Sequence, residues 1–239
     1  MRNSNQINKL RYIAGPIITE EIFDGGGGGT NINDKPENYY LKTNTFCTSK
    51  NGEKSSFNVN LQTGKLYAFQ HLFSVGGNRL PANMYLTYNQ SYANNLQIFE
   101  SESGKTDGAL WFKGWKLNYQ QYLRESGGKI YFYDDNFELH VFEKSENNTS
   151  VYFDKSGKSR LTLTKNSDNT AVIDDGMGTK RHFNARGELT KISVHKGSGV
   201  TELIITYDES NRIATITDGI GRVFSFNYEE SGKVKLEFR

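Results

Sequence analysis

Apolar and polar residues alternate with a period of two along much of this chain. Three segments show it most clearly: 80–88 (Leu80, Ala82, Met84, Leu86, Tyr88), 224–228 (Phe224, Phe226, Tyr228) and 234–238 (Val234, Leu236, Phe238). Successive side chains of a β-strand point to opposite faces, so this spacing predicts strands with one buried face. No window of about twelve residues has the 3.6-residue spacing of a helix. From residue 39 onward we therefore expect an all-β fold, a twisted antiparallel sheet of hairpins.

Turn-forming dipeptides separate the expected strands. They are Asn51-Gly52, Thr63-Gly64, Gly76-Gly77, Gly127-Gly128, Ser156-Gly157, Asp175-Gly176, Ser198-Gly199, Asp218-Gly219 and Ser231-Gly232. Glycine supplies the positive φ angles of tight hairpin turns, and Asp, Asn and Ser bond their side chains to nearby backbone amides. The recurring turn signals indicate consecutive antiparallel hairpins.

An aromatic residue followed by Asp or Asn recurs along the second half of the chain. The five pairs are Tyr133-Asp134, Phe153-Asp154, Phe183-Asn184, Tyr207-Asp208 and Phe226-Asn227, at intervals of 20, 30, 24 and 19 residues. A Gly or Asn usually follows, as at Gly157, Gly187, Asn211 and Gly232. We expect the acid or amide to open a turn, the Gly or Asn to take the left-handed conformation, and the aromatic to pack on the next hairpin.

A second element, Asp-Gly-x-Gly, lies out of phase with these pairs. It occurs at 175–178 and again at 218–222, 43 residues later, where Asp218, Gly221 and Arg222 are its marked positions. The earlier copy has Thr179 where the later one has Arg222. Recurrence at near-regular spacing favours a true repeat over an ordinary β-sandwich with coincidental motifs.

At these residues the chain resembles the RHS family, also called the YD-repeat family. The best matches are YDESNRIATITDGIGRVFSFNY (207–228) and FDKSGKSRLTL (153–163). Upstream, the stretch 60–92 is similar to the segment that opens the repeat region in large RHS proteins, and FKGWKLNYQQYL (112–123) is similar to the motif that follows it. Together these segments cover roughly residues 55–239, and their order is more specific than any one of them.

The resemblance implies a spiral β-sheet that winds into a hollow shell. In bacterial members the shell encloses a C-terminal toxin or effector domain, and related repeats occur in insecticidal toxin complexes and animal adhesion proteins. This chain is too short to close such a shell and lacks the later autoproteolytic segment, so we expect the opening part of a shell. Its expected role is structural and non-catalytic. The expected partner is the remaining shell segment or a toxin or effector domain, on this or another chain.

The first 38 residues differ in composition from the rest. They contain the pentaglycine Gly25–Gly29, so we expect 1–38 to be a flexible leader with a glycine-rich tether, and 39–239 to be the repeat domain. Within the leader, Tyr12–Phe23 has the composition of one short strand, limited by Pro16. No apolar core of a signal peptide and no stretch of transmembrane length is present. With the family resemblance, this favours a bacterial protein that is cytoplasmic before delivery and then secreted or surface-exposed by a non-Sec route.

Charge and composition exclude several classes. The net charge is +2, from 29 basic and 27 acidic residues that are interspersed, which gives no surface for nucleic acid or anionic membrane. Aromatic residues make up 13% of the chain, too many for a disordered protein.

Candidate chemistry is sparse. Cys47 is the single cysteine, and the four histidines, His71, His140, His182 and His195, are not in ligand spacing. The carboxylate doublets Asp134-Asp135 and Asp174-Asp175 lie beside turn residues, where Asp is preferred for its backbone bond. Because the sequence contains no recognisable nucleophile–base pair, we predict no catalytic residues, no metal and no cofactor.

An aromatic group surrounds the second motif of the family match. It comprises Trp111, Phe112, Trp115, Tyr119 and Tyr122. Such residues pack cores and also stack on sugars, so Trp111 and Trp115 are candidate ligand-facing aromatics, although core packing is favoured. The alternative function is accordingly a surface adhesion or carbohydrate-binding β-module.

Overall fold

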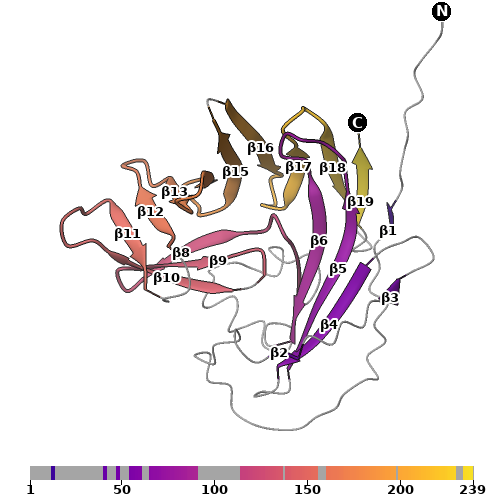
Figure 1. Cartoon of the computed structure of the whole chain (residues 1–239), viewed down its shortest axis with the longest axis horizontal. Coiled ribbons are helices and arrows are strands. Elements are labelled where there is room, and N and C mark those ends of the chain that lie inside the picture. Colours follow the sequence, from indigo (N-terminus) through magenta and orange to yellow (C-terminus); the bar gives the residue numbers. More distant parts are fainter. Residues whose placement is uncertain are drawn as a thin grey trace, which may run out of the picture.

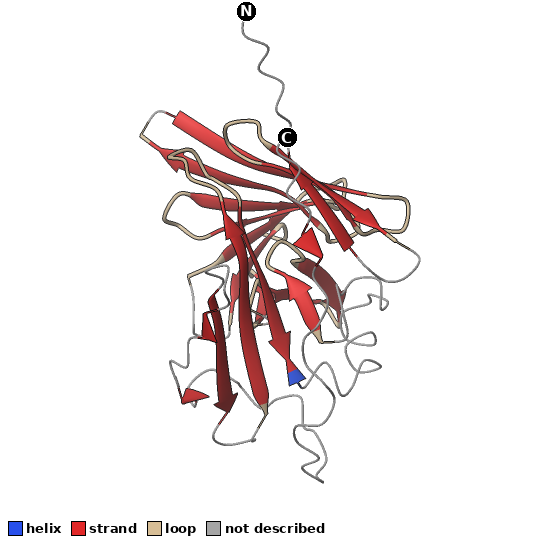
Figure 2. Cartoon of the chain, turned by 90° about the vertical axis from the view of Figure 1, so that its right-hand side faces the viewer, coloured by secondary structure: helices blue, strands red, loops and turns tan. Residues whose placement is uncertain are grey.

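The structure is a computed structural model, and it describes residues 12–13, 40–41, 47–48, 54–60, 65–90, 114–136, 138–155, 160–197, 199–229 and 234–238. Within this part of the chain 61% of residues are in strands and 1% in helix, and the strands pair antiparallel (Figure 2). The all-β prediction is confirmed. The described residues include no helix with the length and apolar character needed to cross a bilayer.

The larger sheet, sheet A, is an antiparallel meander from residue 122 onward. Its strands in spatial order are β1 (Tyr12–Ile13), β19 (Val234–Phe238), β18 (Val223–Tyr228), β17 (Ile213–Thr217), β16 (Gly199–Tyr207), β15 (Leu189–Lys196), β14 (Thr179–Phe183), β13 (Ala171–Asp174), β12 (Thr162–Lys165), β11 (Val151–Asp154), β10 (Leu139–Lys144), β9 (Lys129–Tyr133) and β8 (Tyr122–Ser126). Apart from β1, each strand pairs with its neighbour in sequence, as expected for consecutive hairpins. The exception lies in the predicted leader, where Tyr12 pairs with Leu236 at the edge of the sheet. The pentaglycine lies outside the described residues.

Sheet B is built from the first half of the chain. Its strands are β2 (Tyr40–Leu41), β4 (Lys54–Asn60), β5 (Leu66–Ser74), β6 (Asn83–Asn89) and β7 (Trp115–Leu117), with β3 (Cys47–Thr48) pairing with β4. Figure 1 shows β5 and β6 running beside β17, β18 and β19, while β8 to β13 extend to the opposite side. Cys47 lies in the short strand β3.

The two sheets share one hydrophobic core. Alternation along the strands creates it: on β16, Leu203 is buried whereas its neighbour Ile204 is exposed. Across the sheets, the rings of Phe73 on β5 and Phe224 on β18 lie 5.5 Å apart between centroids. Each large apolar side chain that is fully buried contributes about 1.5–3 kcal/mol, so this shared core is what holds the sheets together.

Sheet A curls so that its edge strand β8 meets the turn between β14 and β15. The Leu123 amide donates to the Gly187 carbonyl at 2.7 Å, and the Leu189 amide donates to the Gln121 carbonyl at 3.1 Å. A Cβ atom on Gly187 would lie 2.3 Å from the Leu123 carbonyl oxygen, and the φ angle of Gly187 is +77°. Glycine is therefore required here for both space and conformation.

Candidate functional site

Five hairpin turns of sheet A repeat one arrangement, which we call the five-residue Asx turn. The turns span 134–138, 175–179, 184–188, 208–212 and 218–222. In each, the side-chain oxygen of the first residue accepts the amides of the third and fifth residues at 2.7–3.1 Å. The amide of the first residue in turn donates to the carbonyl of the fifth. The predicted role of Asp and Asn as turn openers is confirmed at these positions.

The fourth residue of the turn takes a positive φ. It is Gly178, Gly187, Asn211 or Gly221 in the turns where it is described. The aromatic-Asx pairs and the Asp-Gly-x-Gly element therefore form the same type of turn. The two were expected to be different elements out of phase. The Asp-Gly-x-Gly turns follow β13 and β17, and the aromatic-Asx turns opened by Asn184 and Asp208 follow β14 and β16, so these two sets lie at opposite ends of the strands. The turn opened by Asp134 follows β9 and lies at the same end as the Asp-Gly-x-Gly turns.

One of the five predicted pairs is misplaced. Phe226 and Asn227 lie inside β18, where Asn227 pairs with Lys235, so Asn227 does not open a turn. The period-two pattern buries Phe226, and the following Tyr228 takes the repeat position instead. The Tyr228 hydroxyl donates to the Ile213 carbonyl at 2.9 Å, and the Tyr207 hydroxyl donates to the Leu189 carbonyl at 2.8 Å.

These two tyrosines define the true phase of the repeat. Each bonds the carbonyl of the residue that follows an earlier Asx turn, Leu189 after the 184–188 turn and Ile213 after the 208–212 turn. Both are half-buried, and burial raises the pKa of Tyr207 and of Tyr228. Tyr228 also lies under the Arg212 guanidinium, 4.3 Å from the ring centroid. These two hydroxyl groups thereby bond β16 to the start of β15 and β18 to the start of β17.

The other predicted repeat aromatics, Tyr133, Phe183 and Phe153, differ in their surroundings. Tyr133 stacks on Tyr122, and Phe183 meets Phe132 edge to face, with centroids 5.2 and 5.7 Å apart. Phe153, by contrast, is 46% exposed. The predicted turn residues Gly157 and Gly232 lie outside the described residues.

The fifth residue decides the charge of each Asx turn. Arg212 and Arg222 fold back onto the aspartates that open their own turns, with guanidinium-to-carboxylate distances of 2.6–2.8 Å. The Asp218 side chain is fully buried. Although its burial favours the neutral acid, the hydrogen bonds and charge of Arg222 hold the pKa of Asp218 below its ordinary value.

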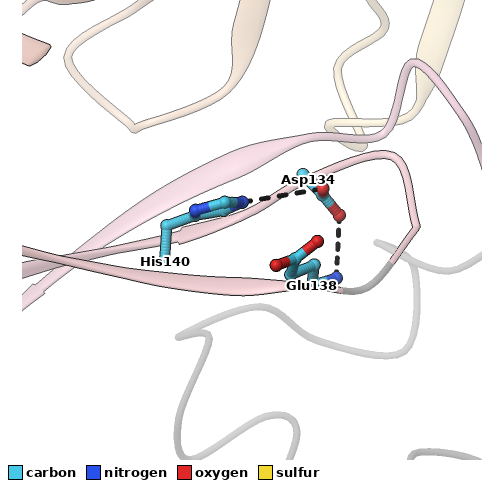
Figure 3. A group of neighbouring side chains, drawn as sticks. All are labelled: Asp134, Glu138 and His140. Atoms are coloured by element: carbon cyan, nitrogen blue, oxygen red, sulfur yellow. Dashed lines mark hydrogen bonds and ion pairs between the residues drawn. The ribbon is translucent and has the colours of Figure 1, made fainter. Parts of the chain in front are cut away.

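The Asp134 turn carries a different chemistry. Its fifth residue is Glu138, a second carboxylate, and His140 follows two residues later on β10. Figure 3 shows Asp134, Glu138 and His140 converging beside the turn between β9 and β10. Their nearest ligand atoms all lie within 4.8 Å of one another. On its other side, His140 Nδ1 lies 3.0 Å from the Oδ2 atom of Asp154, whose side chain is fully buried.

Sheet B holds the backbone of the same turn. The buried ammonium of Lys116 donates to the Asp134 carbonyl, and the Thr87 hydroxyl donates to the Asp135 carbonyl at 2.9 Å. The Tyr85 hydroxyl donates to the Asp135 carboxylate. This cluster of charged and polar groups therefore lies at the junction of the two sheets.

Burial and charge oppose one another in this cluster. Burial lowers the pKa of Lys116 to about 8. Burial also lowers the pKa of His140, but hydrogen bonds to Asp134 and Asp154 outweigh it and the net shift is upward. For Glu138, burial and the charge of Asp134 both raise the pKa. The arrangement favours positive charge near the carboxylates and suits either an ion-pair network or a bound cation.

Sequence spacing did not reveal this cluster. Asp134 and His140 meet across a hairpin, because β9 and β10 pair Phe132 with His140. An Asp-x3-Glu-x-His pattern read across a hairpin turn would have found it. Of the other histidines, His71 contacts Ser74 and His182 contacts Ser193, each away from the cluster.

The candidate ligand-facing aromatics do not form a described platform. Trp115 is half-buried on β7, packs against the shared core and lies 5.2 Å from the ring of Tyr88. Trp111 lies outside the described residues. Trp115 is thus placed as a packing residue.

Comparison with known proteins adds no relative. A scan against protein-family models found no match, and a search of the curated proteins found none either. The resemblance to the RHS family therefore stays a prediction from motif order, and function has to be argued from the geometry above.

Proposed function

We propose that this chain is a structural, non-catalytic wall segment of an RHS-type shell that encloses or scaffolds a toxin or effector. The observation that carries the proposal is the reuse of the five-residue Asx turn in five hairpins of one continuous meander. A device repeated in this way extends a sheet hairpin by hairpin, because each new hairpin needs only the edge left by the previous one.

The tyrosine bonds support the same proposal. Tyr207 and Tyr228 each tie a turn to the backbone of the preceding hairpin, so the register is set between repeats as well as within them. A buried hydroxyl–carbonyl bond contributes about 0.5–1.5 kcal/mol and fixes direction. A wall of many hairpins forms only if each hairpin pairs with the previous one in the correct register. Bonds that fix this register therefore support a structural role.

One-sided burial also suits a wall. On β16 the residues facing the core are Leu203 and Ile205, while the outward face carries Glu202 and Thr206. Across the strands that outer face is lined by polar pairs, including Lys191–Glu202 at 2.8 Å and Thr206–Thr215 at 2.7 Å. The sheet therefore separates an apolar interior from a wet exterior.

Coexpression tests the proposal directly. The chain is produced together with the polypeptide whose coding sequence follows its own, and the purified material is treated with trypsin. We expect the two to copurify, because this chain is too short to close a shell and the following polypeptide supplies the rest of the wall. In the complex, the segment that the completed wall covers should be cleaved at least about tenfold more slowly than in the following polypeptide alone. Cleavage at the free rate, or failure to copurify, would contradict encapsulation.

A glycan array separates this proposal from the adhesion alternative. Saturable glycan binding that is lost in Trp115→Ala, with an unchanged circular dichroism spectrum, would support a carbohydrate-binding module instead. For a shell wall we expect no saturable binding, and we expect Trp115→Ala to lower stability because Trp115 packs against the core.

A further inference from the structure

The Asp134 turn differs at its fifth position from the turns opened by Asp208 and Asp218. In the turns opened by Asp208 and Asp218, an arginine at the fifth position pairs with the opening carboxylate. In the Asp134 turn the fifth residue is Glu138, so a second carboxylate stands where the sisters place a cation. With Asp154 on the far side of His140, three carboxylates lie around one imidazole.

The donor atoms already have the spacing of a ligand set. One imidazole nitrogen and two carboxylate oxygens lie within 4.8 Å of one another. Bonds of about 2.1 Å to a tetrahedral ion would place neighbouring donors about 3.4 Å apart, so closing the site needs movements of roughly an ångström. Asp134 is held for this role by its own turn, since its Oδ1 accepts two amides and its Oδ2 faces His140.

Asp154, on a separate strand, orients the imidazole. Its fully buried carboxylate accepts from His140 Nδ1 at 3.0 Å, which directs Nε2 toward Asp134 and Glu138. Metal-binding histidines commonly donate their second ring nitrogen to a carboxylate in this way, which fixes the tautomer and increases the basicity of the ligand nitrogen. Asp154 thus occupies the place of an outer-shell partner.

We propose that Asp134, Glu138 and His140 form a binding site for a divalent transition-metal ion such as Zn²⁺, with Asp154 as its outer-shell carboxylate. Mixed imidazole and carboxylate ligands suit such an ion better than Mg²⁺ or Ca²⁺, which favour oxygen alone. The same turn is held by Lys116 and Tyr85 of sheet B, so the ion locks the junction between the two sheets. This inference does not depend on the shell function.

Metal titration of the full chain tests the site. After treatment with EDTA and its removal, ZnCl₂ is added in a calorimeter, and CoCl₂ is added while the visible spectrum is recorded. We expect one ion per chain with a micromolar or tighter Kd, and Co²⁺ absorption bands typical of protein ligands. At a hundredfold excess over the Kd, Zn²⁺ should raise the unfolding midpoint by about 5–10 °C.

Matched variants assign the ligands. Glu138→Gln and His140→Gln should each weaken Zn²⁺ binding at least about tenfold, and Asp154→Asn about 10–100-fold. Glu143→Gln is the control, because Glu143 lies on the same strand, is exposed and pairs with Lys129 instead. Its Kd should be unchanged. Should His140→Gln fail to fold, Glu138→Gln decides the outcome, since it keeps the length of the side chain and the backbone bonds of the turn.

Three results would overturn the proposal. One is the absence of stoichiometric Zn²⁺ or Co²⁺ binding to a chain that circular dichroism shows to be folded. Another is equal Zn²⁺ affinity in Glu138→Gln and Glu143→Gln, which would mark surface binding. The third is tighter binding of Ca²⁺ than of Zn²⁺, which would contradict a site with a nitrogen ligand.

Discussion

The turns opened by Asp134 and Asp218 share one backbone design but differ in their charge chemistry. They lie eight strands apart in the meander, both at the same end of their strands, and both contact sheet B. In the first, Lys116 of β7 holds the Asp134 carbonyl. In the second, the Gly219 amide donates to the Leu80 carbonyl at 3.2 Å. The fold thus uses the same turn twice to join its two sheets.

The difference lies in the fifth residue. Arg222 completes a buried ion pair with Asp218, so that turn is neutral and closed. Glu138 places a second carboxylate in the Asp134 turn, beside His140 and near the buried Lys116. The first residue of the turn therefore sets its backbone hydrogen bonds, and the fifth residue sets its charge. Substitutions at these two positions can test the two effects separately.

Removing the carboxylate of the closed turn should have the largest effect. Asp218→Ala leaves Arg222 without its partner and two turn amides without their acceptor, and we expect a loss of about 3 kcal/mol or more in the free energy of unfolding. Asp208→Ala is the control, because the Asp208–Arg212 pair is more exposed. Its loss should be about 1–2 kcal/mol in urea denaturation. Equal losses in the two variants would show that burial of the pair adds nothing.

Next in size is the contact that docks the closed turn on sheet B. A Cβ on Gly219 would lie 2.2 Å from the Arg79 carbonyl oxygen, so we expect Gly219→Ala to cost about 1–3 kcal/mol. Gly221→Asn, two residues away, meets open space and places Asn at a positive φ, as Asn211 already does in its own turn. It should change stability by less than about 0.5 kcal/mol. The unfolding midpoints of the two variants are compared by thermal denaturation. Similar midpoints would contradict a close contact between Gly219 and the segment between β5 and β6.

The closed turn should also be sensitive to acid. The pKa of Asp218 is lowered in the folded protein, so its stabilising effect is present above the unfolded pKa of about 3.9 and is lost as pH falls through the folded value. Asp218→Asn keeps an acceptor for the two amides, as Asn184 does in its turn, but removes the charge. We expect the wild type to exceed this variant by about 1–2 kcal/mol at pH 7. In urea denaturation that gap should narrow below about pH 4, and a gap constant down to pH 3 would refute the charge contribution.

The smallest expected effect concerns the bond between successive repeats. Tyr228→Phe removes the hydroxyl that donates to the Ile213 carbonyl but keeps the ring under Arg212. We expect a loss of about 1 kcal/mol in urea denaturation, with the ring contact preserved. Tyr131→Phe serves as a control, because Tyr131 lies within strand β9. A loss no larger than the control's would mean that the hydroxyl does not contribute to holding the repeats together.

The sequence predicted much of this fold because its signals are local. Strict alternation placed the buried faces of β6 and β18, and Asp or Asn followed by Gly or Asn placed most of the turns. The same local reasoning misplaced one repeat at Asn227. Phe226 and Asn227 imitate an aromatic-Asx pair, but the alternation that buries Phe226 continues through Tyr228, and strand pairing with β19 outweighs the turn preference of one Asn.

The candidate site was much less accessible from sequence. Asp134 was identified as a turn residue, and it is one, but nothing in its neighbourhood indicated that His140 would lie between it and Asp154. That meeting depends on the register of β9, β10 and β11 and on the way these strands pack against sheet B. Register across several strands is a sum of many weak preferences, which inspection of a single segment does not resolve.

By itself, then, the sequence determined an all-β chain of antiparallel hairpins, because strand alternation and turn chemistry act between residues close in sequence. Only the tertiary structure decided which charged side chains at or near the turns are buried. It curled β8 against Gly187, placed Lys116 over the Asp134 turn and brought three ligand-bearing side chains together. Those contacts join residues far apart along the chain, and they form only when the sheets have found their common core.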